Sequence, residues 1–260
     1  MRVAVLSDIR GNLVGLEAIV SDLKTRKVEE VVCLGDVAAS GPQPSEVVER
    51  LQKLGWPCVM GNTDETLAKN IPEKLGKMSE REKRRLKELD EWTRNQLRKT
   101  HRDYLSTFKP TILFNPRNDP NFPRLVCYHG SPRSNQEGIF ATTPDDRLTK
   151  YFADQKSGIF AGGHTHTQMF RRFRNSIVIN PGSVGLPAEK HVPGILGLTH
   201  AEYALLSLSR RSFTLELLSI HYPLGDLEKA VRNSDLPNPN KWLSDWRPSS
   251  DITRHNKSGN

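Results

Sequence analysis

The stretch Ser7-Asp8-Ile9-Arg10-Gly11-Asn12 decides how the rest of the chain is interpreted. The apolar run Val3-Ala4-Val5-Leu6 precedes it, and apolar residues recur at helical spacing over 13–24. The pattern predicts a strand, a tight turn and a helix, in that order. Ligand sites in open α/β sheets lie beyond the carboxyl ends of the strands. Asp8 therefore either holds a cation or substrate there or simply caps a turn.

Composition indicates a soluble protein of one large α/β domain or two small ones. The chain has 260 residues, of which 36% are hydrophobic and 26% charged. No apolar run approaches the roughly 20 residues that span a bilayer, and the first strand is too brief for a signal peptide. Three cysteines without a C-x-x-C pair argue against a disulfide framework and against a thiolate zinc site. We therefore expect a cytoplasmic protein with no membrane partner.

The net charge of +8 favours anionic partners such as nucleotides, nucleic acid or phosphoprotein. Part of the excess lies in 69–103, with twelve Lys and Arg against seven Asp and Glu. Ser79-Glu80-Arg81-Glu82 predicts a capping box there. We expect two inserted helices whose charges form either an ordinary solvated face or a basic lid that recruits anionic substrate.

Strands are predicted at 2–7, 30–34 and 57–60, alternating with helices at 13–24 and 45–54. Three successive strand-turn-helix units predict parallel strands with right-handed crossovers. From about Pro237 the chain is rich in Pro, Ser and Asn, with Trp242 and Trp246 as anchors and a disordered last dozen residues. The remaining predictions are strands at 111–114, 124–128 and 157–161, a helix at 145–154, and an antiparallel series at 169–174, 176–179, 203–208 and 213–220.

Polar side chains stand beside glycine at the ends of five successive predicted strands. Oxygen and imidazole groups without sulfur suit Mn²⁺, Fe²⁺, Co²⁺, Ni²⁺ or Zn²⁺. Each residue alone has an ordinary structural explanation, but their repeated placement predicts one metal site. They are Asp8, Asp36, Asn62, His129, His164 and His166.

The ordered motifs resemble the calcineurin-like metallophosphoesterases, and most closely the compact bacterial and archaeal phosphodiesterase branch. The resemblance covers roughly 1–225, and Asn180-Pro181-Gly182-Ser183-Val184-Gly185 and Glu91-Trp92-Thr93 fit it too. The five motifs are Asp8-Ile9-Arg10-Gly11-Asn12, Gly35-Asp36-Val37, Gly61-Asn62-Thr63-Asp64, His129-Gly130-Ser131 and Gly163-His164-Thr165-His166.

The resemblance implies an α/β (α+β) fold, a four-layer αββα sandwich of two mixed β-sheets flanked by helices. We assign 1–236 to this domain, with a helical basic insert at about 69–108, and 237–260 to a C-terminal extension.

The resemblance also implies the roles of the site residues. Asp36 would bridge two ions; Asn62, His129 and His164 would complete the shell of one, and Asp8 and His166 would hold the other. Two ions activate a water that attacks phosphorus directly. With Arg10, the residues Asp36, Asn62 and His129 form the predicted catalytic set.

Two positions depart from the family pattern. Arg10 stands where the family has a histidine ligand, and a guanidinium has five donors and no acceptor, so it cannot bind a metal. We therefore expect one tight and one weaker metal site, with Arg10 gripping a phosphate oxygen. Thr63 stands where many members have a histidine that protonates the leaving group. His191 and His200 are candidates for that acid by residue type alone.

The leading hypothesis is a metal-dependent phosphoesterase acting on phosphomonoesters, phosphodiesters or nucleotide anhydrides of small molecules. One alternative is a binding scaffold with a decayed centre, which Arg10 favours. Another is a nuclease or RNA phosphodiesterase, which the basic insert favours although no aromatic stacking cluster accompanies it. The sequence does not decode the substrate or the oligomeric state.

Overall fold

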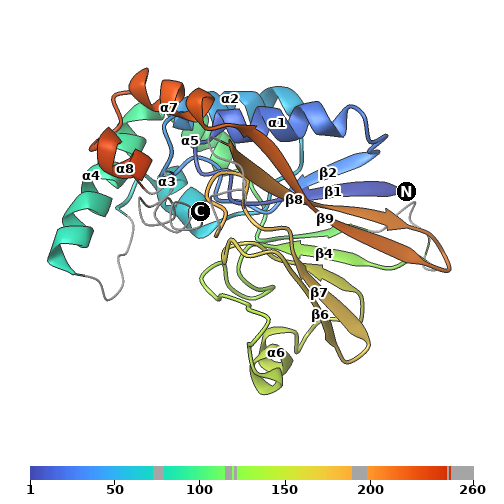
Figure 1. Ribbon diagram of the computed structural model, residues 1–260. Helices are drawn as coiled ribbons and strands as arrows, with labels where there is room; N and C mark the ends of the chain where they lie inside the picture. Colours follow the sequence, from blue (N-terminus) through green and yellow to red (C-terminus); the bar gives the residue numbers. More distant parts are fainter. Residues whose placement is uncertain (73–78, 115–118, 120–121, 189–197, 245, 247–260) are drawn as a thin grey trace, which may run out of the picture.

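The computed structural model describes residues 1–72, 79–114, 119, 122–188, 198–244 and 246. Two packed β-sheets form its centre, with helices on both outer sides (Figure 1). The strands are β1 (Arg2–Leu6), β2 (Glu30–Cys33), β3 (Thr111–Phe114), β4 (Leu125–Tyr128), β5 (Ile159–Ala161), β6 (Met169–Phe173), β7 (Ser176–Asn180), β8 (Leu198–Leu208) and β9 (Phe213–Pro223). The helices are α1 (Leu13–Leu23), α2 (Pro44–Leu54), α3 (Asn62–Lys69), α4 (Glu80–Gln96), α5 (Lys99–Leu105), α6 (Asp145–Tyr151), α7 (Leu224–Arg232) and α8 (Pro239–Ser244).

Both sheets are mixed, as the family resemblance implies. One has the strand order β2-β1-β8-β9, in which β1 runs parallel to β2 and antiparallel to β8. The other has the order β3-β4-β5-β7-β6, with β5 parallel to both neighbours. The carboxyl ends of β1, β2, β4 and β5 lead into the loops that carry five of the six predicted metal ligands, and the sixth, Asn62, begins α3. The topology therefore brings motifs from distant parts of the sequence to one edge of the sandwich.

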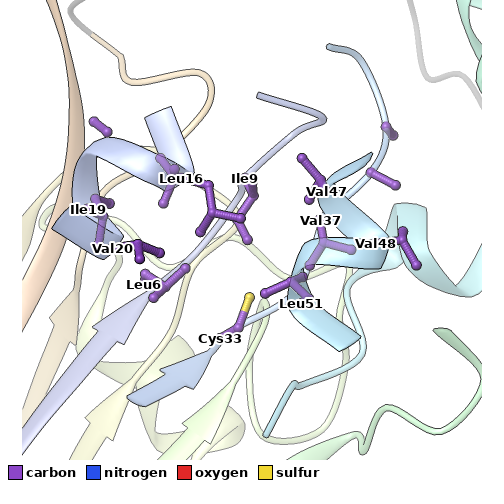
Figure 2. Close-up of a cluster of buried hydrophobic side chains, with 14 of the residues drawn as sticks. Leu6, Ile9, Leu16, Ile19, Val20, Cys33, Val37, Val47, Val48 and Leu51 are labelled. Carbon is purple, nitrogen blue, oxygen red and sulfur yellow. The ribbon is translucent and has the colours of Figure 1, made fainter. Parts of the chain in front are cut away.

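Apolar residues alternate between two cores because β1 is buried on both faces. Ala4 and Leu6 pack in the cluster with α1 and α2, whereas Val3 and Val5 pack between the sheets. Figure 2 shows the first of these clusters, where Leu16 of α1 lies close to Leu6 and Ile9. A third cluster joins the second sheet to α6. The predicted four-layer sandwich is confirmed.

One strand prediction differs from the structure. The segment 57–60 forms single bridges, Cys33 with Cys58 and Val59 with Lys109, instead of a strand, because each neighbour pairs with it at one residue only. The four strands predicted as an antiparallel series all occur. They form the hairpins β6–β7 and β8–β9, which belong to different sheets. Hairpin patterning is local, and the sequence pattern did not show that the chain changes sheet between β7 and β8.

The two helices predicted in the basic segment are α4 and α5. Ser79 caps α4 by accepting from the Glu82 N–H at 3.3 Å, while the Glu82 carboxylate accepts from the Ser79 N–H at 3.1 Å. Thr93 is the buried residue of α4, so most of this helix faces solvent. The predicted disordered end lies outside the described residues. Among those described, every helix is too short or too polar to span a lipid bilayer.

Candidate metal centre

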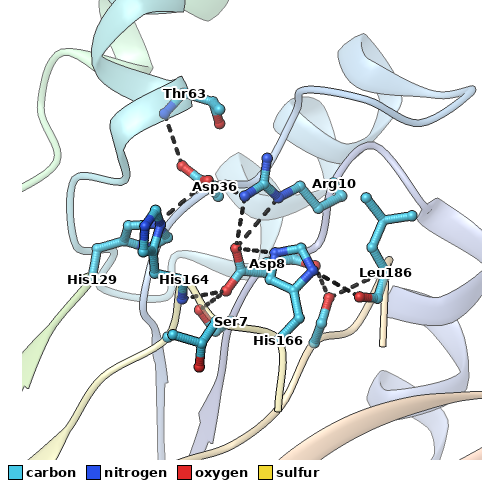
Figure 3. A network of polar contacts seen from close by, with 12 residues as sticks. Ser7, Asp8, Arg10, Asp36, Thr63, His129, His164, His166 and Leu186 are labelled. Carbon is cyan, nitrogen blue, oxygen red and sulfur yellow. Dashed lines mark hydrogen bonds and ion pairs between the residues drawn. The ribbon is translucent and has the colours of Figure 1, made fainter. Parts of the chain in front are cut away.

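The end of β1 and the loop after it present Asp8 and Arg10 to the centre (Figure 3). Asp8 is fully buried, and its Oδ2 accepts from the Ser7 hydroxyl at 2.6 Å and from the His164 N–H at 2.9 Å. Its Oδ1 lies 3.0 Å from His166 Nε2. Burial alone would raise the pKa of Asp8, but the neighbouring His166, His129 and Arg10 lower it below its usual range. The carboxylate is therefore held in its charged form.

The loop after β2 carries Asp36, which is also fully buried. Its Oδ1 accepts from the Thr63 N–H at 2.9 Å, whereas its Oδ2 forms an ion pair with Arg10 Nη2 and lies 3.4 Å from His129 Nε2. Burial would raise the pKa of Asp36, but Arg10 and His129 hold it well below its usual range. A buried carboxylate needs a positive charge beside it, and the Arg10 guanidinium supplies one here.

Four ligand-type atoms converge around His129. The His129 Nδ1 lies 2.8 Å from the backbone oxygen of Leu34, so this nitrogen donates and Nε2 of the neutral ring is left with a lone pair. That Nε2 lies 3.1 Å from Asn62 Oδ1, 3.2 Å from His164 Nδ1 and 3.4 Å from Asp36 Oδ2. Mutually facing acceptors need a positive charge between them. Burial would lower the pKa of His129, but Asp36 and Asp8 raise it to about 9, so without a metal ion a proton on His129 supplies that positive charge at neutral pH.

This donor set fits a divalent transition-metal ion. The ligand atoms of Asp36, His129 and His164 all lie within 4.8 Å of one another, and Asn62 adds a neutral oxygen to them. One carboxylate, one amide oxygen and two imidazoles suit a borderline ion and match the predicted composition of the tighter site. The Leu34 carbonyl fixes the orientation of His129, as outer-shell partners of metal ligands do.

Arg10 occupies the space between the two carboxylates. Its Nη2 lies 3.2 Å from Asp8 Oδ1 and forms a closer ion pair with Asp36 Oδ2. The guanidinium therefore bridges Asp8 and Asp36. His166 completes this side of the centre, with Nδ1 2.7 Å from the backbone oxygen of Leu186 and Nε2 directed at Asp8.

Left-handed backbone conformations recur through the centre. Asp8, Arg10, Asp36, His164 and His166 have φ angles of 56°, 54°, 54°, 67° and 57°, which non-glycine residues seldom adopt. Each such residue costs on the order of 1–3 kcal/mol and persists only where its surroundings fix it. Their concentration at one site indicates that these side chains are directed inward at the expense of stability.

The glycines of the motifs leave room for the carboxylates. A Cβ on Gly61 would collide with Asp36, and one on Gly163 would collide with the Ser7 hydroxyl and lie 2.9 Å from Asp8 Oδ2. The spacing of glycine and ligand in these motifs thus reflects close approach of backbone to side chain. At Gly61 and Gly163 the glycine thus makes room for a predicted ligand carboxylate.

Two residues that support the centre were not predicted. Asp64 accepts from the N–H groups of Asp36 at 2.6 Å, Val37 at 2.9 Å and Gly61 at 3.2 Å. Burial and the nearby Asp36 raise the pKa of Asp64 to about 7. Its position three residues after a glycine, in the first turn of α3, was an available signal of capping.

Ser183 is the second supporting residue. Its hydroxyl donates to the Asp8 carbonyl at 2.8 Å and accepts from the Leu186 N–H at 2.8 Å. Asn180 of the same motif donates to the Gly163 carbonyl at 2.8 Å. This loop therefore ties the Asp8 turn to the histidine loop. No local pattern in the sequence indicates that contact.

His200, one of the two candidates for a leaving-group acid, is not part of the centre. His191 lies outside the described residues. His200 lies on β8, 3.7 Å from Glu202 and next to the His221 ring. A cavity opens beside the centre, and His200 does not line it. The Thr63 hydroxyl is buried without a partner, and only its backbone N–H contacts Asp36. Among the described residues, Arg10, His164 and His166 face that cavity from the centre.

The geometry agrees with a family comparison. The model of the calcineurin-like phosphoesterase superfamily domain matches residues 1–203. The chain belongs to the calcineurin-like phosphoesterase superfamily. This family is metal-dependent, and Asp36, His129 and His164 form a possible metal-binding group in this member.

Relatives resemble the chain over almost its whole length. An uncharacterised protein of Methanocaldococcus jannaschii is 25% identical and aligns with 94% of this chain and 96% of its own. A metallophosphoesterase from Sphaerobacter thermophilus superposes with a TM-score of 0.70 at 24% identity, covering 94% of this chain and 97% of that one. A hypothetical protein from Pyrococcus horikoshii gives a TM-score of 0.74 at 18% identity, covering 95% and 97%. These structures share the fold.

Proposed function

We propose that the protein is a metal-dependent hydrolase of phosphate esters, acting on phosphomonoesters, phosphodiesters or nucleotide anhydrides. The observation that carries this proposal is the convergence of acceptor atoms from Asp36, Asn62 and His164 on His129 Nε2, at 3.1 to 3.4 Å. These residues would hold one tightly bound divalent ion, of Mn, Fe, Co, Ni or Zn. A bound ion supplies Lewis acidity, which lowers the pKa of water and polarises a phosphoryl oxygen.

Arg10 is the second positive charge of the proposed centre. Its guanidinium neutralises Asp8 and Asp36, and part of it faces the adjacent cavity, with 11% of the side chain exposed. The guanidinium would grip a non-bridging phosphate oxygen bidentately. Asp8, Asp36 and His166 together would still accept a second ion weakly, in competition with Arg10. The proposed catalytic residues are thus Asp36, Asn62, His129 and Arg10.

Leaving groups of low pKa suit this centre. Thr63 replaces the histidine that protonates the leaving group in many members, and its hydroxyl is buried away from the cavity. An alcohol that departs as a stable anion does not need that proton. Nitrophenyl esters are therefore the appropriate first substrates.

The experiment is hydrolysis of bis-(p-nitrophenyl) phosphate after chelator treatment and addition of Mn²⁺, with metal content measured in parallel. His164→Ala is expected to lose both bound metal and turnover. His221→Ala is the matched control, because His221 is exposed on β9 and is distant in the sequence from the motifs. Absence of turnover with every divalent metal would overturn the hydrolase and favour the protein-binding scaffold, the alternative that Arg10 supports.

The basic segment supports one further candidate, a nuclease or RNA phosphodiesterase. Arg81 and Arg84 are exposed on α4, and Arg85 lines a smaller cavity beyond Leu186. If α4 binds nucleic acid, cleavage of single-stranded oligonucleotides falls steeply with salt. Replacing Lys83, Arg84 and Arg85 together by glutamine reduces that salt dependence. If cleavage of the oligonucleotides does not depend on salt, or if none is cleaved, the nuclease is excluded and small-molecule phosphate esters remain as the substrates.

A further inference from the structure

Glu202, on β8, contacts the loop that follows β7 and carries Ser183. Its carboxylate accepts from the Ser183 N–H at 3.2 Å, and its own N–H donates to the Ser183 carbonyl at 3.0 Å. The side chain is only 12% exposed. A Cβ on Gly182 would come within 2.1 Å of Glu202 Oε2, so the carboxylate lies directly against the loop. Glu202 therefore holds Ser183 through both its backbone and its side chain.

The same loop bonds to the turn that carries Asp8. The pairing between β1 and β8 ends at Val5 of β1. Beyond that point the loop takes the place of β8 beside β1, because the Val184 N–H donates to the Ser7 carbonyl at 3.0 Å. The Gly185 N–H then donates to the Asp8 carbonyl at 2.9 Å. The backbone of Asp8 is thus fixed by a segment that β8 holds from its other side.

The loop also orients His166 (Figure 3). The Leu186 carbonyl accepts from His166 Nδ1 at 2.7 Å, and the Leu186 N–H donates to the Ser183 hydroxyl at 2.8 Å. Since a carbonyl can only accept, the proton is on Nδ1, and Nε2 faces Asp8 Oδ1 at 3.0 Å. Both residues on this side of the centre therefore depend on the position of one loop.

We propose that Glu202 is a positioning residue for the side of the centre that Asp8 and His166 form. Ser183 is fully buried, so removal of the carboxylate would leave its N–H without an acceptor and away from water. The loop would then move to satisfy this N–H and would take the backbone partners of Asp8 and His166 with it. The positioning requires neither metal nor substrate, whereas its effect on turnover rests on the proposed function.

Histidine ring N–H signals test the positioning in the metal-free protein. His166 Nδ1 donates to Leu186 and His129 Nδ1 donates to Leu34, so each should give a slowly exchanging signal in ¹⁵N-labelled protein. Replacing each histidine by alanine assigns the signals. Glu202→Ala is expected to shift or remove the His166 signal and to keep that of His129, whose partner ends β2. An unchanged His166 signal would overturn the proposal.

Amide exchange gives a second measurement of the same loop. The N–H groups of Val184 and Gly185, which donate to the Asp8 turn, should exchange faster in Glu202→Ala than in the parent. Equal exchange rates in the two proteins would show that the carboxylate does not hold the loop, and would also overturn the proposal.

Two variants distinguish positioning from general loss of stability. Glu202→Gln keeps the length of the side chain and an oxygen acceptor, so it should retain both ring signals. Glu30→Ala removes a carboxylate exposed at the start of β2, and should change neither signal. If Glu202→Gln behaves like Glu202→Ala, or if the His129 signal changes as much as that of His166, Glu202 only stabilises the fold.

Turnover connects the positioning with the proposed function. With Mn²⁺, Glu202→Ala should keep its tightly bound ion and hydrolyse bis-(p-nitrophenyl) phosphate about tenfold more slowly, in line with the loss of outer-shell partners. A shifted His166 signal in a protein whose parent hydrolyses no ester retains the positioning and removes the hydrolase. Turnover of Glu202→Ala equal to that of an active parent retains the hydrolase and removes the role of Glu202 in it.

Discussion

Replacing Arg10 by histidine tests the nature of the second positive charge. In the structure, the guanidinium bridges Asp8 and Asp36, where a second ion would share the same oxygens. Histidine supplies a neutral ligand, and it is among the residues that tolerate the left-handed φ of 54° at this position. We expect Arg10→His to bind a second ion tightly and to hydrolyse phosphodiesters faster.

The expected gain in affinity for a second ion follows from its repulsion by the Arg10 guanidinium. Two unit charges 4 Å apart interact by about 4 kcal/mol at an effective dielectric constant of 20, and a divalent ion beside a guanidinium by about twice that. Arg10 can move aside at the cost of its ion pairs, so only part of this repulsion is realised. We expect the affinity for the second ion to increase at least about 100-fold, equal to about 2.8 kcal/mol.

Without bound metal, the Arg10→His variant should be less stable than the parent protein. Arg10→His leaves two buried carboxylates without their permanent cation, and loss of one partner of a buried pair costs about 3–5 kcal/mol. The metal-free variant should therefore melt at a lower temperature than the metal-free parent, and Mn²⁺ should raise its Tm by more.

Metal stoichiometry decides the outcome. Mass spectrometry of protein dialysed against buffered Mn²⁺ should give one tight equivalent for the parent and two for Arg10→His. Arg133→His is the control, because Arg133 is 54% exposed and pairs with Glu137 outside the centre. Two tight equivalents in the parent would refute the account. A variant that binds metal no better and loses activity would make Arg10 a required catalytic group.

Three further predictions concern the supporting structure. Gly163→Ala drives a Cβ into the Ser7 hydroxyl, so metal content and turnover should fall, whereas Gly225→Ala meets nothing within 4 Å and should leave both unchanged. Asn12→Ala removes the acceptor that caps α1 and should lower the free energy of unfolding by about 1–2 kcal/mol in urea titrations; an unchanged midpoint would contradict this. Because burial raises the pKa of Cys127 to about 12 and all three cysteines are buried, Ellman's reagent should label no thiol in the native protein at pH 8 and three after unfolding. Rapid labelling of any native thiol would show that the core opens readily.

Much of the fold could be predicted because its signals are local. The apolar run Val3 to Leu6 and the helical spacing after Leu13 depend on neighbouring residues only, and both elements occur. A strand was wrongly predicted at 57–60. Whether this segment forms a strand depends on how many residues pair with it from the segments beside it, and those lie far away in the sequence. The last four strands were also predictable as antiparallel strands, but a hairpin does not reveal which sheet it joins.

The sequence by itself determined which ligand-type residues follow the predicted strands, since residue types and their spacing are local properties. Tertiary structure alone decided how those groups are used. It directs the Arg10 guanidinium between Asp8 and Asp36, and it brings Trp242 within the cavity that His166 lines. These contacts join segments far apart in the chain, and only the packing of two sheets and their helices sets such distances. For that reason the metal-binding side could be read from the motifs, whereas the substrate-binding side could not.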